Sequence, residues 1–321
     1  MEIAHPLNSK LQSKTYLTII ILSGIIFFIP FLGRVHLFDW DEINFAESAR
    51  EMLVTGNYHR VQINFQPFWE KPPLFFWLQA GCMKLFGVNE FAARLPNAIF
   101  GIITLVTIFV IGKKYKNPRF GFIWAISYLG TFLPHLYFKS AIIDPVFNYF
   151  IFLGIYYMFK SLALPKTRTG LLYIALSGLF IGLSTLTKGP VGLLIFLISF
   201  FAYFIFTRFK NFPGIKSILA FILLYVIVCF FWFGIEVINN GFWFLKEFLS
   251  YQVDLFLHPV ASHGEPFYYH FVVVFLGCFP VSIIALPVLF GNKIFGKNNF
   301  RLLMKILFWT VMILFSITTT K

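Results

Sequence analysis

Long apolar stretches separated by short polar segments dominate the chain. Nine of them come close to the roughly 20 residues that an α-helix needs to cross the hydrocarbon core of a bilayer. They cover residues 15–32, 95–112, 120–138, 141–159, 171–187, 189–207, 218–235, 267–290 and 302–319. The pattern predicts an all-α, polytopic membrane protein with about nine transmembrane helices.

Two of the polar segments are much longer than the others, residues 34–94 and 236–266. Within the first, residues 42–54 carry apolar side chains at helical spacing, and residues 74–86 form a second apolar segment. Both predict amphipathic helices that lie at the membrane surface. Long loops are where membrane proteins place functional residues, so these segments are the first places to look for a site.

The composition excludes a water-soluble protein, because 59% of the 321 residues are hydrophobic and only 12% are charged. Average soluble domains carry roughly 25% charged residues. The abundance of apolar residues also excludes a disordered chain. The three cysteines have no metal-binding spacing, and two of them lie inside apolar runs. They predict neither a disulfide framework nor a zinc site.

The net charge of +13 follows the predicted topology. With the N-terminus in the cytoplasm, the inner segments contain 16 of the 26 basic residues and only one of the 13 acidic residues, Glu2. Cytoplasmic loops of membrane proteins carry such an excess of Lys and Arg. The charge therefore indicates orientation, and no nucleic acid partner is needed to explain it.

Acidic residues open the first long outer segment. Asp39 and Glu42 have the spacing of a capping box, and carboxylates in the first turn also suit the helix dipole. Alternatively, Asp41 or Glu42, held at the boundary between water and lipid, acts as a general base or binds a cation. The spacing alone favours capping.

Glu70 and Lys71 lie between Phe68-Trp69 and Pro72-Pro73, in a segment that cannot be helical. A rigid turn with both charges can hold a phosphate at Lys71 and a metal ion or a hydroxyl at Glu70. The alternative is an interfacial lysine with a neighbouring counter-charge. The sequence leaves both open.

Asp144 and Lys188 are charged residues at the outer ends of apolar runs. Asp144 precedes Pro145, which is typical of a helix start, and Lys188 precedes Gly189-Pro190, which is typical of a helix end. An ionisable residue in such a run is also a functional candidate. A lone lysine at this level is well placed for a lipid phosphate.

The last outer segment contains three histidines and a glutamate within a short stretch: His258, His263, Glu265 and His270. They are candidate metal ligands, although their spacing matches no closed zinc site. All these candidates fall on the predicted outer side at similar depth. Together they predict a site for an anionic lipid substrate.

Three segments in series resemble a known superfamily. They are Asp41-Glu42-x-x-Phe45-Ala46-Glu47-x-Ala49-Arg50-Glu51-Met52, Glu70-Lys71-Pro72-Pro73-Leu74 and Leu186-Thr187-Lys188-Gly189-Pro190. The series is similar to the integral-membrane glycosyltransferases of the GT-C class, in the bacterial branch with the lipid A aminoarabinose transferase and the protein mannosyltransferases. The resemblance covers nearly the whole chain.

This resemblance implies sugar transfer at the outer face of the bacterial inner membrane. The donor would be a sugar linked to polyprenyl phosphate (undecaprenyl phosphate), and the acceptor lipid A, another glycolipid or a protein. Asp41 matches the catalytic aspartate, with Glu42 beside it as a further substrate-binding candidate. Lys71 and Lys188 match the residues that hold the donor phosphate, and Asp144 matches an acidic residue of the same cavity.

The resemblance also implies a divalent metal ion, because Glu70 and His263 match a Glu/His pair seen with one. Two departures stand out. Asn44 occupies a position where family members usually carry Arg, and family sequences continue beyond Lys321 with more spans and often a soluble outer domain. We therefore expect residues 1–321 to form a single transmembrane catalytic domain that lacks those later parts.

A secondary transporter with an outward-facing charged cavity is the alternative from another functional class. Against it, no charge lies at the middle of a predicted span, and the ionisable candidates gather at one face. The sequence thus favours an enzyme whose partners are membrane lipids, a lipid-linked donor and a lipid or protein acceptor.

Overall fold

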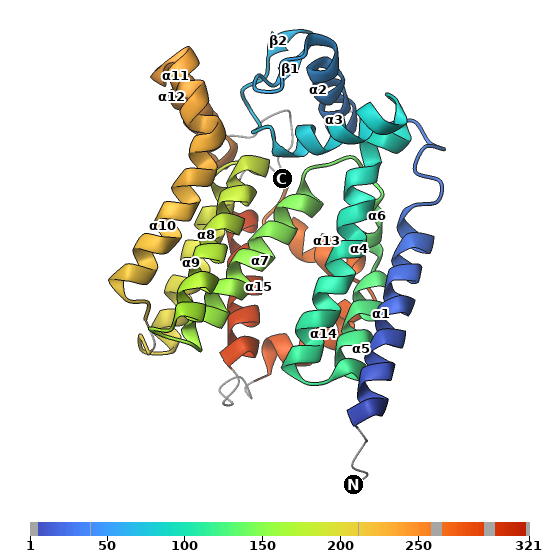
Figure 1. Ribbon diagram of the computed structural model, residues 1–321, viewed down its shortest axis with the longest axis vertical. Coiled ribbons are helices and arrows are strands. Elements are labelled where there is room, and N and C mark those ends of the chain that lie inside the picture. The colour runs from blue at the N-terminus through green and yellow to red at the C-terminus, as the bar shows by residue number, and fades with distance from the viewer. Residues whose placement is uncertain (1–5, 39, 211, 258–264, 292–298, 319–321) are drawn as a thin grey trace.

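Helices that run roughly side by side make up most of the protein (Figure 1). The computed structural model describes residues 6–38, 40–210, 212–257, 265–291 and 299–318. Because the hydrocarbon core contains no water, a spanning segment must satisfy its own backbone hydrogen bonds, as a helix does. The bundle consists of α1 (Pro6–Phe28), α4 (Glu90–Tyr115), α5 (Pro118–Leu129), α6 (Phe132–Phe138), α7 (Asp144–Leu162), α8 (Arg168–Lys188), α9 (Val191–Phe206), α10 (Ile215–Cys229), α13 (Tyr269–Gly277), α14 (Val281–Phe290) and α15 (Asn299–Ile317). The predicted all-α membrane fold is confirmed.

The count of nine full-length spans is not confirmed. Among the described residues, five helical segments are long and apolar enough to cross a membrane: Leu11–Phe28, Glu90–Tyr115, Arg168–Lys188, Ile215–Asn240 and Asn299–Ile317. The fourth comprises α10, the π-helical turn η1 (Phe230–Gly234) and α11 (Ile235–Asn240). The predicted span 120–138 is divided into α5 and α6, and the span 267–290 into α13 and α14. Hydropathy did not reveal these interruptions, because apolar residues continue through both breaks.

A small layer covers the end of the bundle opposite to the N-terminus (Figure 1). It contains α2 (Asp41–Thr55), α3 (Leu74–Phe86) and a hairpin of β1 (Gln62–Ile63) and β2 (Gln66–Pro67). The two predicted surface helices are thus confirmed. Asn64 and Phe65 form the hairpin turn with φ of 54° and 58°, as a two-residue turn of this type requires. Helix α12 (Phe242–Leu257) projects beside this layer at the same end.

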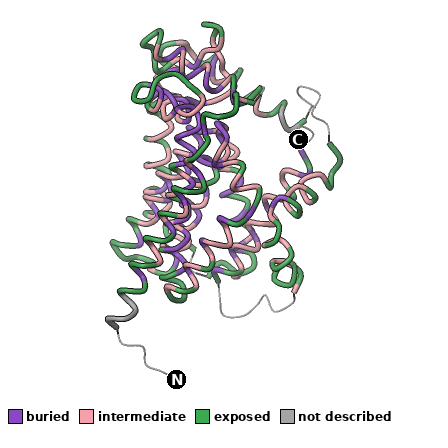
Figure 2. Tube along the Cα trace, turned by 90° about the vertical axis from the view of Figure 1, so that its right-hand side faces the viewer, coloured by how far each residue is buried: buried purple, intermediate pink, exposed green. Residues whose placement is uncertain are grey.

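Buried residues lie along the inside of the bundle and exposed residues along its outside (Figure 2). The largest hydrophobic cluster joins α7, α8, α9 and α15 through residues such as Ile151, Ile181 and Phe196. Glycine permits the closest approach between helices, because a Cβ at Gly178 of α8 would collide with the backbone oxygen of Phe221 in α10. Large apolar side chains such as Leu223 remain exposed on the outer surface, as expected of helices that face lipid.

Candidate active site

The ends of α7 and α8 bring the first two candidates together. Lys188 is the last residue of α8, and Gly189 follows it with φ of 97°, so the predicted helix end is confirmed. Asp144 is the first residue of α7 and is followed by Pro145, as the helix-start pattern predicted. Lys188 Nζ donates to Asp144 Oδ1 at 2.6 Å, and each side chain retains 30% exposure. Asp144 therefore begins α7 and Lys188 ends α8, and the two side chains also form a partly accessible ion pair.

Lys71 lies beside this pair, in the connection between β2 and α3. Its side chain is half-buried, and burial lowers its pKa below the ordinary lysine value. The positive charge of Lys188 lowers this pKa further, whereas Glu70, Asp41 and Asp144 raise it. All four groups therefore lie close enough to act on Lys71. Two neighbouring ammonium groups of which one is poorly hydrated form a natural site for an anion.

Helix α12 supplies a wall that the sequence did not predict. Tyr251 donates its hydroxyl to Glu70 Oε2 at 2.6 Å, and Lys71 Nζ lies 5.2 Å from the centroid of the Tyr251 ring. Gln252 Nε2 also donates to the Glu70 carbonyl at 3.4 Å. Burial, followed by the neighbouring Glu70, raises the pKa of Tyr251, so its proton remains available for this bond. The only sequence signal for these contacts is the aromatic content of the second outer segment.

Asp41 is the first residue of α2 and its side chain is exposed. Its charge acts on the pKa of Lys71 and of Tyr251, which places it at the same site. Trp40, which precedes it, has φ of 70°, a left-handed conformation that is uncommon outside glycine. Such strained backbone is often found at functional sites, where the surrounding structure maintains it.

Glu42 has a different environment from Asp41. It is 1% exposed and accepts hydrogen bonds from Arg94 Nε at 3.0 Å and Arg94 Nη2 at 2.7 Å. Its oxygens also accept from the backbone amides of Phe38 and Ala141, at 2.7 and 2.5 Å. Glu42 does reach back to the backbone before its helix, as a capping residue would, but to Phe38. With both oxygens bonded inside the protein, Glu42 supports the fold at this point.

Arg94 makes this contact a hub between four segments. Besides Glu42, it donates to the carbonyl oxygens of Leu32, Val35 and His36 at 2.7–2.9 Å. One turn further along α4, Asn97 Nδ2 donates to the carbonyls at positions 140 and 142, at 2.6 Å each. The hub therefore fixes the start of α2 at Asp41 and the backbone leading to Asp144. Arg94 was not among the residues predicted for the site, although a single arginine next to an apolar run is a recognisable signal.

The structure describes only one of the two predicted metal ligands, Glu70. His263 lies outside the described residues, and Asp39, the predicted N-cap, does as well. Within the described ranges, no group of three or more His, Cys, Asp or Glu side chains is arranged to hold a metal ion. The other proposed ligand, Glu70, is already bonded to Tyr251. The described part of the chain therefore does not by itself provide a complete set of metal ligands.

The arrangement that remains consists of two lysines, three carboxylates and a tyrosine at one end of a membrane-type helix bundle. A model of the dolichyl-phosphate-mannose-protein mannosyltransferase family matches residues 70–233, about half of the chain. The chain belongs to this family. The match includes Glu70, Lys71, Asp144 and Lys188, so most of the site lies inside the family's region.

Curated relatives and a solved structure agree with this membership. The chain is 27% identical over 289 residues to the undecaprenyl phosphate-alpha-4-amino-4-deoxy-L-arabinose arabinosyl transferase of Wigglesworthia glossinidia brevipalpis, covering 86% of this chain and 49% of the relative. It is 25% identical to the enzyme of the same name from Shewanella sediminis, covering 85% of this chain and 50% of that enzyme. The chain spans about half the length of these relatives.

The crystal structure of ArnT from Cupriavidus metallidurans bound to undecaprenyl phosphate has the same fold. The TM-score is 0.82 at 18% identity, over 96% of this chain and 56% of that one. Five of the described helical segments are suited to span a bilayer, and with this fold the chain is a multi-pass membrane protein. The secondary-transporter alternative has no support in these comparisons.

Proposed function

We propose that the chain is the membrane part of a glycosyltransferase that moves a sugar from a polyprenyl phosphate, such as undecaprenyl phosphate, to lipid A, another glycolipid or a protein. The observation that carries this proposal is the meeting of Lys71 and Lys188 with Asp41 and Asp144 at one end of the bundle. The relatives named for transfer from undecaprenyl phosphate support the choice of donor.

The two lysines bind the phosphate of the donor and stabilise the negative charge that develops on it as the sugar departs. Phosphate is a good leaving group, so the reaction needs cations at the leaving oxygen more than it needs an acid. The bond from Lys188 to Asp144 keeps the ammonium group at this position before the donor binds. When the donor binds, Lys188 exchanges its bond to Asp144 for a bond to a phosphate oxygen. Lys71 reaches the same place from the connection between β2 and α3, where its ammonium lies over the ring of Tyr251.

Asp41 accepts the proton, or the hydrogen bond, of the attacking acceptor group. Its side chain is exposed at the start of α2, where an acceptor group can reach it. A positioned base of this kind typically accelerates such a step by about 10²–10⁴-fold. The backbone hub at Arg94 and Glu42 keeps Asp41 in place.

The orientation is also part of the proposal. The N-terminus is cytoplasmic and the site lies at the outer face of the inner membrane. The basic residues of the predicted inner segments support this orientation, and Figure 1 places the N-terminus at the opposite end from the layer of α2 and α3. Lipid-linked donors present their phosphate at the headgroup plane, which is the level of that layer.

A divalent ion held by Glu70 and His263 remains a prediction, and no step above depends on it. If these residues bind a metal, EDTA lowers transfer, added Mn²⁺ or Zn²⁺ restores it, and Glu70→Gln abolishes the restoration. Transfer that is unchanged by thorough chelation would remove the metal from the proposal.

The deciding experiment is transfer from a panel of polyprenyl-phosphate sugars to lipid A and to peptide acceptors. Asp41→Asn should lower kcat by about 100-fold or more with little change in donor binding, because only the base is removed. Lys71→Gln and Lys188→Gln should instead weaken binding of undecaprenyl phosphate. Lys84→Gln, which alters an exposed lysine of α3, serves as the control. Full activity of Asp41→Asn would refute the catalytic assignment.

A further inference from the structure

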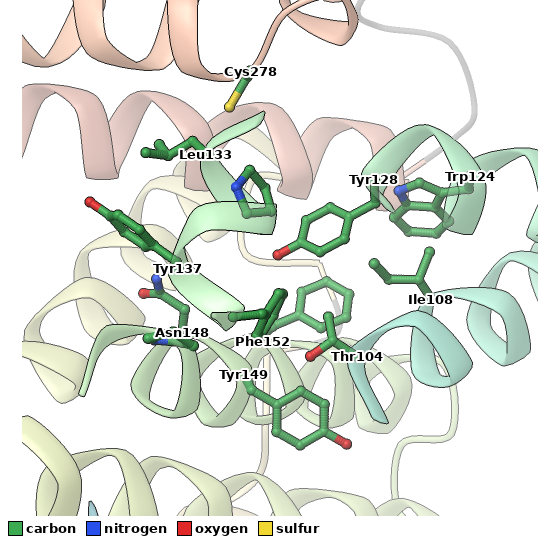
Figure 3. A pocket seen from close by; sticks show the side chains of 13 residues that line it. Thr104, Ile108, Trp124, Tyr128, Leu133, Tyr137, Asn148, Tyr149, Phe152 and Cys278 are labelled. Carbon is green, nitrogen blue, oxygen red and sulfur yellow. The ribbon is translucent and has the colours of Figure 1, made fainter. Parts of the chain in front are cut away.

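Two of the cavities in the bundle differ in charge. One lies among α4, α5, α6 and α7, and Figure 3 shows its aromatic and aliphatic walls with a few hydroxyl and amide groups. None of its lining residues is charged. The other, which we call the basic cavity, has a volume of 510 Å³ and is lined by Lys166 and Lys216. Of these two, the basic cavity is the one suited to an anion, because a lysine ammonium is a common partner of phosphate.

The basic cavity lies at the opposite end of the bundle from the candidate active site. Its walls come from the end of α7, the starts of α8 and α10, and the connections that precede these two helices. Helix α8 runs for 21 residues from Arg168 to Lys188, so its two ends are about 30 Å apart. Figure 1 shows both connections at the end of the bundle that faces away from the layer of α2 and α3. A ligand in the basic cavity is therefore distinct from a donor at Lys71 and Lys188.

Both rims of the basic cavity are held in place by the fold. In the connection before α8, Thr167 Oγ1 donates to the Leu164 carbonyl at 2.9 Å and accepts from the Gly170 amide at 3.0 Å. In the connection before α10, the ring of Phe212 packs against Phe204 of α9, with 4.9 Å between the ring centroids. The two lysines are therefore carried by segments that the fold fixes, and the hollow between them is part of the architecture.

The described residues provide no carboxylate at this end to balance the two lysines. Between Asp144 and Glu236 the sequence contains seven basic residues and no acidic residue. The described residues outside 41–90, 144 and 236–265 contain no acidic residue either. Neither lysine ammonium forms a hydrogen bond or an ion pair with a described residue. The charge complementary to the basic cavity is therefore an anion from outside the described chain.

The surroundings of the basic cavity favour a lipid over a free anion. Its floor is apolar, because the buried side chains of Leu162 and Ile174 line it. Ile215 also lines the cavity, and Leu219 and Leu223 follow at intervals of about one turn on the same face of α10. All three are exposed, and they form an apolar stripe that leads away from the lysines. A phosphate bound at the lysines would thus place attached hydrocarbon chains against this stripe.

We propose that the basic cavity binds the headgroup phosphate of an anionic glycerophospholipid from the leaflet at this end of the bundle, with acyl chains along the apolar stripe. In the orientation proposed above, this is the cytoplasmic leaflet. Basic pockets between transmembrane helices on that side bind such headgroups. The bound lipid stabilises the start of the helix whose last residue is Lys188. The proposal does not depend on sugar transfer, so either proposal can fail without the other.

Native mass spectrometry of the detergent-solubilised protein, titrated with dioleoylphosphatidylglycerol, tests the site. Lys166→Gln/Lys216→Gln should weaken binding of the tightest lipid about 30-fold, because each lysine near an anionic lipid contributes about fivefold. Lys114→Gln/Lys116→Gln is the matched control, because it removes the same charge at the same end of the bundle but outside the cavity. This control should leave binding unchanged. An equal loss in the two double variants would indicate diffuse attraction to basic loops and would overturn the proposal.

The headgroup is tested by a change of lipid or of anion. Dioleoylphosphatidylcholine has the same acyl chains but no net charge, and it should bind about tenfold or more weakly than dioleoylphosphatidylglycerol. Inorganic phosphate in large excess should not displace the anionic lipid, because it cannot contact the apolar stripe. Equal binding of the two lipids would contradict an anion site. Complete displacement by phosphate would show a site for a free anion and would equally contradict the proposal.

A filling variant separates a cavity from an open basic surface. Ser217 lines the cavity, so Ser217→Phe narrows it without any change of charge. This variant should weaken binding of dioleoylphosphatidylglycerol about tenfold, since an overpacked site excludes its ligand. Thr169→Phe, which alters an exposed residue of α8 outside the lining, should leave binding unchanged. An unaltered affinity in folded Ser217→Phe would show that the lipid does not enter the basic cavity.

Discussion

Replacement of Arg94 by Met tests the hub that fixes Asp41. Arg94 is 3% exposed and donates five hydrogen bonds, two to Glu42 and three to backbone carbonyls. The variant leaves the Glu42 carboxylate, 1% exposed, without its counter-charge. Removal of one partner from a buried ion pair costs about 3–5 kcal/mol. We therefore expect Arg94→Met to lower the free energy of unfolding by this amount.

A double-mutant cycle separates the ion pair from the other bonds of Arg94. In Glu42→Gln/Arg94→Met neither charge of this buried pair remains. The double variant should therefore lose about 1–3 kcal/mol less free energy of unfolding than the sum of the losses in the two single variants. Thermal unfolding in detergent micelles measures this stability. Arg34→Met is the control, because Arg34 is an exposed arginine in the segment between α1 and α2 to which Arg94 donates. This variant should change the free energy of unfolding little.

Activity provides the readout that a purely structural role would not give. Because Glu42 follows Asp41 directly, the single variants should lower kcat more than they raise KM for the donor, and Arg94→Lys should restore part of kcat. Strictly additive single and double variants, each costing less than about 1 kcal/mol, would refute the hub, since a buried pair must be coupled.

Three further outcomes are expected. Binding of undecaprenyl phosphate should weaken as pH rises through the lowered pKa of Lys71, which is below 10.5, because binding requires the ammonium form. Lys71→Arg should move this loss of binding to higher pH. Identical pH titrations of the two proteins would contradict the role of Lys71. Tyr251→Phe removes a hydrogen bond to a carboxylate, worth about 1.5–3 kcal/mol, and should lower kcat/KM for the donor about tenfold, as steady-state kinetics will show. Asn97→Ala removes two hydrogen bonds to the backbone before Asp144 and should cost about 1–3 kcal/mol in thermal unfolding, with an unaltered melting temperature as the contrary result.

The sequence predicted most helices of the bundle, but it did not predict where two of the expected spans are interrupted. Apolar runs predicted most helices because spanning a bilayer demands them. Charges at the ends of those runs selected Asp144 and Lys188 as candidates, and the segment between Trp69 and Pro72 selected Lys71; the structure brings the three together. The breaks within two predicted spans were missed. In those regions the apolar pattern continues, and the interruption depends on packing between α6 and α13 rather than on local residue preference.

Contacts between distant residues account for the other omissions. The residues around Glu42 predicted a helix cap, a general base or a cation ligand, and they could not reveal its partner Arg94, which is 52 positions away. The bond between Tyr251 and Glu70 joins residues 181 positions apart. Spacing rules describe a single helix or turn, so they cannot show which side chains the folded bundle brings into contact.

The order in which these parts are synthesised has a consequence for the growing chain. The first half of the site, from Asp41 to the Glu42–Arg94 pair, can form once α4 has left the ribosome. Tyr251 and Gln252, which hold Glu70, follow much later. At about 5–20 residues per second, Asp41 waits roughly 10–40 s for Tyr251. During that interval the nascent chain contains a fixed aspartate without the α12 wall, so α12 completes the site late in membrane insertion.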